Sequence, residues 1–463
     1  MMELFSSHHR IGIIGHFYFG KTVLATSIIN NIKNHSKKYM PIKSNEAGGN
    51  STNDIEINFA EELPPDTGFE QFPYADIRKK IHTQWPDLTE KIRQYKCSFF
   101  RSDWPMTKGY LSLVDIPGQR MSDLPMANKT FAQWSDWIND RFAEEADPTA
   151  CGDWQRYLDD LKQSLSELNN AKKIVESYKN LLKNLFINKR PLITPSTFLI
   201  SSNGEINFKN IKNNDITKCL TGLTNEKEFA PLPKDFRNSN KTLEKEYEKN
   251  YNLYRSEIVN PILISLLNCN SIVFLVDIAT ILSQGPGWYN LSKEMVKDTL
   301  EILKPGYSIP QYILRSLGSN IINMLGFGST GIKKVAFIVP KADVIRMEDH
   351  ELAINLLNNF TKTLTPLIGR NRICIEFHHD VISAAYSVEQ VGNDKIRAKH
   401  GKDSTKEVEI TLPKLPEEWE DDWPKEKYKF PTVIAPIIPK LIDSPPKSYN
   451  LNKLIAFLLK PSY

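Results

Sequence analysis

The sequence predicts an α/β protein with a mostly parallel sheet that is flanked by helices and interrupted by a large helical insertion. Three short, continuously apolar runs are typical of buried parallel strands: 11–14, 271–276 and 335–339. The first run leads into G-x-x-x-x-G-K-T over 15–22, and then into a helix in which Leu24, Ile28 and Ile32 recur at helical spacing. A strand, a glycine loop and a helix in this order predict a phosphate-binding loop, and with it a P-loop NTPase fold.

The loop at 15–22 has the chemistry that phosphate binding requires. Backbone N–H groups and the positive end of the helix point at the anion, Lys21 adds a charge, and the Thr22 hydroxyl is suited to Mg²⁺. Bulky residues fill 16–19, and we expect them to pack over the nucleotide, over a partner or on the fold itself. The expected nucleotide contacts are Gly15, Phe19, Gly20, Lys21, Thr22 and Val23. The alternative is that the pattern arose by chance.

A second motif follows a predicted hairpin of strands at 93–101 and 109–115. The second strand ends in D-I-P-G-Q, which suits the Mg²⁺ end of a nucleotide site. We expect Asp115 to bind Mg²⁺ through water, the Gly118 N–H to meet the γ-phosphate, and Gln119 to position the attacking water. The alternative is an ordinary exit from a strand into a turn.

A third motif, P-K-A-D over 340–343, follows the apolar strand at 335–339. Many GTPases read guanine with Lys-x-Asp after a late strand, because the carboxylate accepts two hydrogen bonds from the base and the lysine stem lies along the ring. Adenine presents no such pair of donors. The expected base contacts are Lys341 and Asp343, with Ser383 and Ala384 after a last strand at 373–382.

His378, His379 and Asp380 are adjacent on that last strand, which invites a metal-site interpretation. Neighbouring residues on a strand point to opposite faces, so a structural role is expected.

The rest of the chain divides into recognisable segments. A polar stretch, 35–70, is predicted as a loop region. Apolar stripes at 154–188 and 241–268 predict long helices, interpreted as an insertion that packs on its own domain, with a partner-binding coiled coil as the alternative. Further helices are expected at 291–304 and 309–325, the latter apolar enough to touch a membrane.

The C-terminal part is predicted to hold an edge strand at 407–412, a proline-rich wrap and a short helix at 450–459. The expected division is 1–133 for the first part of the nucleotide-binding core, 134–268 for the helical insertion, 269–400 for the second part of the core, and 401–463 for the wrap.

Composition excludes several classes of protein. A net charge of +4 argues against nucleic acid or an anionic membrane as the main partner. The five cysteines are scattered without a C-x-x-C pair, which is typical of reduced thiols in the cytoplasm. No signal peptide opens the chain, and no stretch reaches the roughly 18 apolar residues of a membrane span. A cytosolic protein is expected, with peripheral membrane contact left open.

Taken together, the motifs resemble the YcjX-like family of bacterial P-loop GTPases over essentially the whole chain. The resemblance is carried by 15–22, 72–74, Trp85-Pro86 with Thr89, 114–118, 123–125, 131–135, 254–261, 276–277, 341–343, 430–431 and 456–459. It implies a GTPase-like core with a helical insertion, GTP or GDP with Mg²⁺, and a stress-linked bacterial role without a settled partner. By position, Thr89 resembles the switch threonine that closes on Mg²⁺ and the γ-phosphate; a plain turn or capping threonine is the alternative.

Two departures from the family pattern bear on function. The family usually has an acidic residue where Gln119 stands, so we expect GTP hydrolysis by this chain to differ from that of other family members. It usually has threonine where Pro340 stands, and proline cannot donate a hydrogen bond to brace the guanine loop.

We therefore expect a GTP-binding NTPase in which Lys21, Gln119 and Thr89 carry catalysis, while Thr22, Asp115 and Thr89 hold Mg²⁺. Hydrolysis is expected to be slow unless a partner supplies a cation. An ATP-using P-loop ATPase is one alternative, because Pro340 weakens the guanine loop. Another is a nucleotide-gated scaffold with negligible turnover, whose insertion binds a protein partner. A small-molecule kinase is less favoured, because no clear arginine-rich lid is present.

Overall fold

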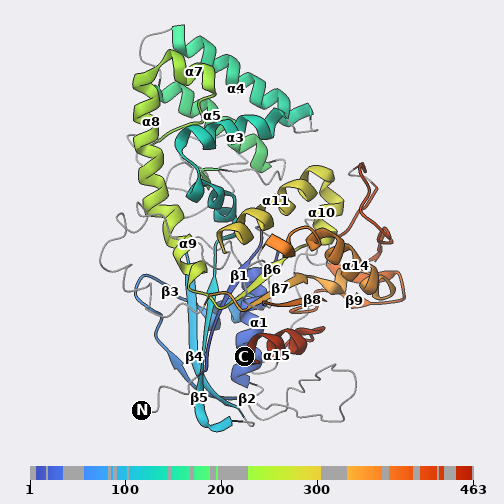
Figure 1. Ribbon diagram of the computed structural model, residues 1–463. Helices are drawn as coiled ribbons and strands as arrows, with labels where there is room; N and C mark the ends of the chain where they lie inside the picture. The colour runs from blue at the N-terminus through green and yellow to red at the C-terminus, as the bar shows by residue number, and fades with distance from the viewer. Residues whose placement is uncertain are drawn as a thin grey trace.

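A central β-sheet carries helices on both faces in the computed structural model of the protein (Figure 1). The structure describes residues 7–16, 19–34, 57–81, 85–86, 91–101, 104–143, 148–166, 171–187, 194–196, 228–303, 331–367, 375–399, 407–424, 427–431 and 445–460. The sheet is formed by β1 (Ser7–Ile14), β2 (Ile57–Leu63), β3 (Glu70–Gln71), β4 (Arg93–Arg101), β5 (Trp104–Asp115), β6 (Ser271–Leu275), β7 (Lys334–Val339) and β8 (Glu376–Val381).

The strand order is β2-β4-β5-β1-β6-β7-β8, with β3 paired to β4. β5, β1, β6, β7 and β8 are mutually parallel, and β4 joins β5 as the antiparallel hairpin. The mostly parallel sheet and the hairpin predicted from the sequence are therefore confirmed.

The prediction of a loop over 35–70 is wrong at Ile57–Leu63, because β2 lies there and pairs antiparallel with β4, whereas 64–69 form no helix or strand. β2 is an edge strand, and an edge strand needs no continuous apolar run. Its exposed glutamates form ion pairs instead, Glu61 with Lys108 and Glu62 with Lys33. The polar composition that indicated a loop is that of a solvated strand.

The two faces of the sheet are covered by different helices. One face packs against α1 (Lys21–Asn34), α2 (Tyr74–Lys80) and α15 (Leu451–Leu459), and the other against α9 (Asn260–Leu267), α10 (Ile278–Gln284) and α14 (His350–Thr361). Side chains of β1 alternate between the two cores: Ile11 and Ile13 face the first and Ile14 the second. Gly12 leaves room for β6 and for the connection from α9 to β6, since a Cβ there would lie 3.1 Å from Ile272 Cδ1 and 3.2 Å from Cys269 Sγ.

A helical region extends beyond one end of the sheet (Figure 1). It contains α3 (Phe131–Ala143), α4 (Pro148–Ser166), α5 (Ala171–Ile187), α7 (Lys234–Ser239) and α8 (Lys241–Tyr254). The single helical stretch predicted over 154–188 is two helices, α4 and α5, and the slip in its apolar stripe falls between them. Their apolar residues, Trp154 and Leu161 on α4 and Val175 and Leu182 on α5, share one core. This confirms packing within the chain.

The predicted helix over 241–268 is also present, but it changes character part-way. α8 passes directly into a π-helical turn, η6 (Arg255–Val259), and then into α9. Pro261 in the first turn of α9 has no N–H and cannot complete the regular hydrogen-bond ladder, which accounts for an irregular turn just before it.

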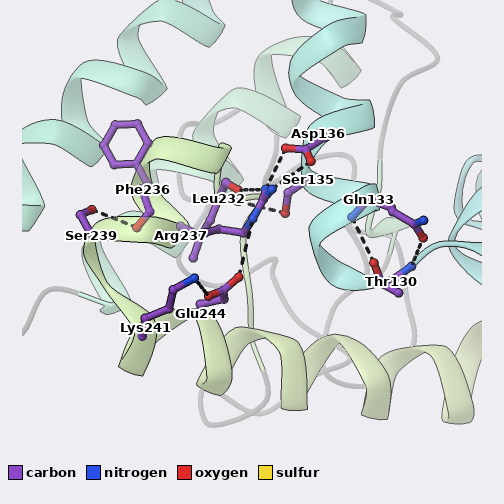
Figure 2. A network of polar contacts seen from close by, with 10 residues as sticks. All are labelled: Thr130, Gln133, Ser135, Asp136, Leu232, Phe236, Arg237, Ser239, Lys241 and Glu244. Carbon is purple, nitrogen blue, oxygen red and sulfur yellow. Dashed lines mark hydrogen bonds and ion pairs between the residues drawn. The ribbon is translucent and has the colours of Figure 1, made fainter.

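Polar contacts hold α3, α7 and α8 together (Figure 2). The guanidinium of Arg237 on α7 donates two hydrogen bonds of 2.9 Å to the carboxylate of Asp136 on α3, and lies 3.7 Å from Glu244 on α8. At the start of α3, Thr130 and Gln133 form a capping box: Gln133 N donates to Thr130 Oγ1 at 3.2 Å, and Thr130 N donates to Gln133 Oε1 at 2.9 Å.

The remaining elements are one long helix, four 3₁₀ turns and a small sheet. They are α11 (Pro286–Ile302), the 3₁₀ turns η2 (Gly118–Asn128), η7 (Ala342–Val344), η8 (Met347–Asp349) and η9 (Thr365–Leu367), and a small antiparallel sheet of β9 (Glu389–Gln390), β10 (Lys395–Lys399) and β11 (Glu407–Thr411). The expected helix at 309–325 lies outside the described residues. In the C-terminal segment, the indoles of Trp419 and Trp423 donate to Leu356 O on α14 and Leu282 O on α10, both at 2.8 Å.

Two of the scattered cysteines, Cys97 and Cys269, are buried free thiols. Among the helices in the described ranges, none combines the length and apolar character that crossing a membrane requires.

The carbonyl end of α15 is held by basic residues of the sheet. Arg101 on β4 donates to Leu459 O at 2.8 Å, His9 on β1 donates to Leu458 O at 3.2 Å, and Lys334 on β7 donates to Phe457 O at 2.6 Å. The last carbonyls of a helix lack intrahelical partners, and its C-terminus favours cations. These contacts tie the C-terminal helix across three strands.

Replacing Arg101 by methionine should lower the free energy of unfolding by about 1–3 kcal/mol, because it leaves the buried Leu459 carbonyl without its charged donor. Lys108→Met, which removes an exposed ion pair with Glu61 and a cation–π contact with Phe100, is the control and should change it by less than about 1 kcal/mol. Urea denaturation measures both. Equal losses in the two variants would contradict the proposed role of Arg101.

Candidate functional site

The carboxyl ends of the parallel strands lie along one edge of the sheet, and most of the predicted site residues follow them. β1 sits between β5 and β6, with Ile13 paired to Asp115 and Ile14 paired to Phe274. The chain leaves β1 through α1 toward one face and leaves β6 through α10 toward the other. In open α/β sheets, ligands bind outside the strand ends at such a change of direction. The loop after β1 is therefore the candidate site.

Two glycines shape the loop between β1 and α1. A Cβ on Gly15 would lie 3.1 Å from Leu275 Cβ and 3.2 Å from Leu275 O, so the close approach to β6 requires glycine. Gly20 has φ +88°, a left-handed conformation that favours glycine, and no described atom lies within 4 Å of the position of its missing Cβ. Residues 17 and 18 of the loop lie outside the described residues.

Lys21, the first residue of α1, lies back across this loop. Its side chain is buried, and Nζ donates to Gly15 O at 2.9 Å and to His16 O at 2.8 Å. Burial lowers the pKa of Lys21 to about 8, while the charge of Asp115 opposes the shift. The burial cost thus exceeds the attraction of the nearby carboxylate, and an anion placed at this ammonium would offset that cost.

Thr22 brings α1 into contact with the end of β5. Its Oγ1 donates to Asp115 Oδ2 at 3.1 Å, across a separation of 93 residues in the chain. Asp115 is fully buried. A hydroxyl and a carboxylate oxygen are the hard ligands that Mg²⁺ prefers, so the pair fits the predicted metal.

The other residues predicted for the phosphate end are placed as follows. Gly118 begins η2, three residues after Asp115, and Gln119 is the next residue of η2. Val23 is half-buried in the first turn of α1. Thr89 lies outside the described residues.

An aromatic group beside the loop was not predicted as a unit. The buried ring of His16 makes edge-on contacts with Phe19 and Trp288, at centroid distances of 5.4 and 5.5 Å. Burial, aided by Lys21, lowers the pKa of His16 to about 3, so the imidazole is neutral. Phe19 packs into the core beneath α1, which is the third of the expected options for the bulky residues.

Lys341, expected along the base, makes a different contact. It has φ +60°, and its Nζ lies 2.6 Å from Asp277 Oδ2. Asp277 follows β6, is fully buried, and caps α10 by accepting hydrogen bonds from Thr280 N and Thr280 Oγ1 at 3.0 and 2.8 Å. In the sequence, only the family resemblance pointed to Asp277. Its partner Lys341 is 64 residues away, and its contacts with Thr280 are those of an ordinary helix cap.

Asp343 is 3% exposed, and its carboxylate is held by the segment after β8. Ser383 Oγ donates to Oδ1 at 2.8 Å, while Ser387 N and Ser387 Oγ both donate to Oδ2 at 2.6 Å. The Asp343 carbonyl accepts from Gln390 Nε2 at 3.1 Å. Ser383 and Ser387 thus hold the Asp343 loop in place by hydrogen bonds, whereas Pro340 has no N–H to donate. A carboxylate has about four acceptor sites, so these three bonds leave little capacity for a base.

The His378–Asp380 run has the structural role expected. His378 stacks on Phe457 of α15, whereas His379 bonds Thr361 of α14 at 3.0 Å, on the opposite face of the sheet. Within the described part of the chain, no group of three or more His, Cys, Asp or Glu side chains is arranged to hold a metal.

The model of the YcjX-like family, DUF463, matches residues 9–462. The chain belongs to this family. The match runs from β1 to beyond α15, so the resemblance seen in scattered motifs holds across nearly the whole chain. Comparison with curated proteins gave no match.

Acid should destabilise this YcjX-like protein partly through His16. Its pKa is lowered to about 3 in the folded state from 6.5, so below pH 6.5 the unfolded chain binds a proton that the folded protein does not. The contribution of neutral His16 to the free energy of unfolding is fully present above pH 6.5 and is lost as the pH falls toward 3. The stability advantage of the wild type over His16→Asn should shrink by up to about 1.4 kcal/mol per pH unit in this window. Urea denaturation at stepped pH measures it, and a constant difference would contradict the assignment.

Proposed function

We propose that this YcjX-like protein binds GTP or GDP with Mg²⁺ at the loop between β1 and α1 and hydrolyses GTP as a P-loop NTPase. The observation that carries the proposal is the contact between Thr22 and Asp115 beside the Lys21 ammonium. Lys21 and Thr22, which are neighbours at the start of α1, meet there with Asp115 at the end of β5, 93 residues from Thr22 in the chain.

Each residue has a definite part in this proposal. Lys21 Nζ exchanges the carbonyls of Gly15 and His16 for phosphate oxygens, and the N-terminus of α1 adds its positive end. Thr22 would hold Mg²⁺ directly and Asp115 through water. When bound, the metal neutralises phosphate charge and fixes the orientation of the phosphates.

Hydrolysis is proposed to depend on the Gly118 N–H, Gln119 and Thr89, with the attacking water positioned by Gln119 or by a partner. Phosphoryl transfer relies on positioning and charge compensation. Arg120, the arginine of η2, donates to Ser196 Oγ at 3.1 Å and to Tyr254 OH at 3.4 Å. This supports slow intrinsic turnover that a partner or a second copy accelerates by supplying a cation.

For the base, we propose that Lys341 and Asp343 read guanine together with Ser383 and Ala384. The Ser383 contact supports this, since it orients Asp343 Oδ1. Guanine would have to displace Ser387 from Oδ2, because both of its donors need acceptor sites. The same occupied carboxylate favours a second candidate, an ATP-using P-loop NTPase that makes no use of Asp343.

The wider role follows from the family. We propose a stress-linked bacterial switch in the cytoplasm, with a nucleotide-binding core at 1–133 and 269–400, a C-terminal wrap at 401–463, and an insertion at 134–268 that contacts a protein partner.

Thr22→Ala should weaken binding of fluorescently labelled GTP in Mg²⁺ by at least about tenfold, or 1.4 kcal/mol, and abolish most of the difference between Mg²⁺ and EDTA. Thr26→Ala is the matched control: its buried hydroxyl, one turn further along α1, donates to Thr22 O at 2.7 Å and faces no proposed ligand. Titration by fluorescence anisotropy measures both. Equal behaviour of the two variants, or no binding by the wild type, would overturn the proposal.

Asp343→Asn should shift preference from guanine toward xanthine nucleotides, because the amide replaces one acceptor with a donor. Asp349→Asn removes another buried carboxylate, which accepts from Leu415 N at 3.0 Å, and should leave the preference unchanged. Competition by GTP, XTP and ATP against labelled GDP measures it. Tight ATP binding without preference for GTP would favour the adenine-using alternative.

A further inference from the structure

We propose that η2, the segment that follows Asp115, couples nucleotide binding to the position of helices α3 to α8 through a buried contact with the α8–η6 helix. The coupling rests on the proposed function, since it needs a nucleotide at the Asp115 end of the site. It adds a route from that site to the helical region.

η2 lies between the two parts of the molecule. It starts three residues after Asp115, and its side chains Arg120, Met121 and Asp123 are buried. Met121 and its neighbours belong to the core that includes both Val114 of β5 and Tyr254 of α8. Because this core is close-packed, a displacement of Gly118 toward a phosphate would also shift the side chains of α8 that belong to it.

One face of the α8–η6 helix is directed at η2. Tyr251, Tyr254 and Arg255 have the i, i+3, i+4 spacing of a single helix face. Tyr251 OH donates to Met126 O at 3.2 Å and to Lys129 O at 2.9 Å, and Arg255 Nη1 also donates to Lys129 O at 2.9 Å. Together these bonds hold the end of η2 and the residue that follows it.

The centre of the contact is the buried carboxylate of Asp123. Oδ2 accepts from Tyr254 OH at 2.6 Å and from Ser196 Oγ at 2.5 Å, and Oδ1 accepts from Ser196 N at 3.0 Å. Burial raises the pKa of Asp123, and the charge of Arg120 opposes the shift. A satisfied polar network in a dry interior has strict geometry, so η2 moves only if the tyrosine and the serine follow or the network breaks.

The helix has an irregular turn at this contact. Tyr254 is the last residue of α8, and η6 begins at Arg255. π-Helical turns occur frequently at functional sites, and here the turn allows α8 to reorient against α9 without losing helical structure. The irregular turn itself lies against η2, between α8 and the part of the helix, α9, that packs on the sheet.

The helical region is connected to η2 by a second route, through the chain itself. η2 ends at Asn128, and the capping box of Thr130 and Gln133 starts α3 two residues later (Figure 2). The Arg237–Asp136 pair then joins α3 to α7, and Glu244 extends the contact to α8 (Figure 2). The helices that receive a movement of η2 are therefore held as one unit.

The test compares Tyr254→Phe with Tyr247→Phe. Both remove one buried hydroxyl from α8, but Tyr247 OH donates to Ala171 O at 2.7 Å and does not reach η2. Hydrogen exchange of peptides from α4 and α5 is followed in the protein without nucleotide, with GDP and with a non-hydrolysable GTP analogue. Thermal unfolding of both variants establishes that they are folded.

In the wild type we expect nucleotide to change exchange in α4 and α5, although neither helix supplies a proposed ligand. Tyr254→Phe should reduce that change by at least about threefold and alter nucleotide affinity in the same sense, because coupling is reciprocal; Tyr247→Phe should keep both. Nucleotide binding without any exchange response in the helices, or equal losses in the two variants, would overturn the coupling alone. Absence of nucleotide binding by the wild type would overturn the proposed function and the coupling with it.

Discussion

β1 is hydrogen-bonded to β5 on one side and to β6 on the other, and the candidate site depends on this central pairing. The parallel register places Asp115 beside Ile13, so the carboxylate reaches the level at which β1 gives way to its loop. The pairing with β6 brings Gly15 against Leu275, where no side chain fits. A slip of one residue would turn every side chain of β1 to the other face and remove Asp115 from Thr22. The position and register of β1 therefore determine which side chains can meet at this site.

Burial gives the site its electrostatic character. Lys21 and Asp115 are both withdrawn from water, yet the lysine hydrogen-bonds loop carbonyls and the aspartate accepts from Thr22. The hydrogen-bond partners of Lys21 Nζ are neutral carbonyls, and the attraction of Asp115 does not offset the cost of burying the ammonium, which is why burial dominates the pKa of Lys21. The neighbouring imidazole of His16 is held neutral and adds no competing cation. In the proposed function, the phosphate anion would offset the burial of the Lys21 ammonium, and the divalent cation that of the Asp115 carboxylate.

The sequence predicted what is encoded locally. Apolar runs predicted β1, β6 and β7, and the glycine loop predicted the turn into α1. The features that the sequence did not predict depend on residues that are distant in the chain. The predicted loop over 35–70 contains β2, because an edge strand can be polar and is recognised only by its pairing with β4. The contact of Lys341 with Asp277 spans 64 residues, that of Asp343 with Ser387 spans 44, and that of Asp123 with Tyr254 spans 131. No local spacing specifies such pairs, since each is fixed by packing of the sheet and helices.

The loop that carries Asp343 shows how a local departure is offset by the tertiary structure. Pro340 removes a donor, but Ala342 N donates to Ile382 O at 3.1 Å and Ala342 O accepts from His350 Nε2 at 3.0 Å. Ser383 is in turn bridged to Tyr449, with N–H···O bonds of 3.2 and 2.9 Å, directly before α15. Because the far end of α15 is held by basic residues of β1, β4 and β7, the constraint on this loop extends across the sheet to the C-terminal helix. Asp343 and α15 are therefore joined through Ser383, Tyr449 and the residues that lead into the helix.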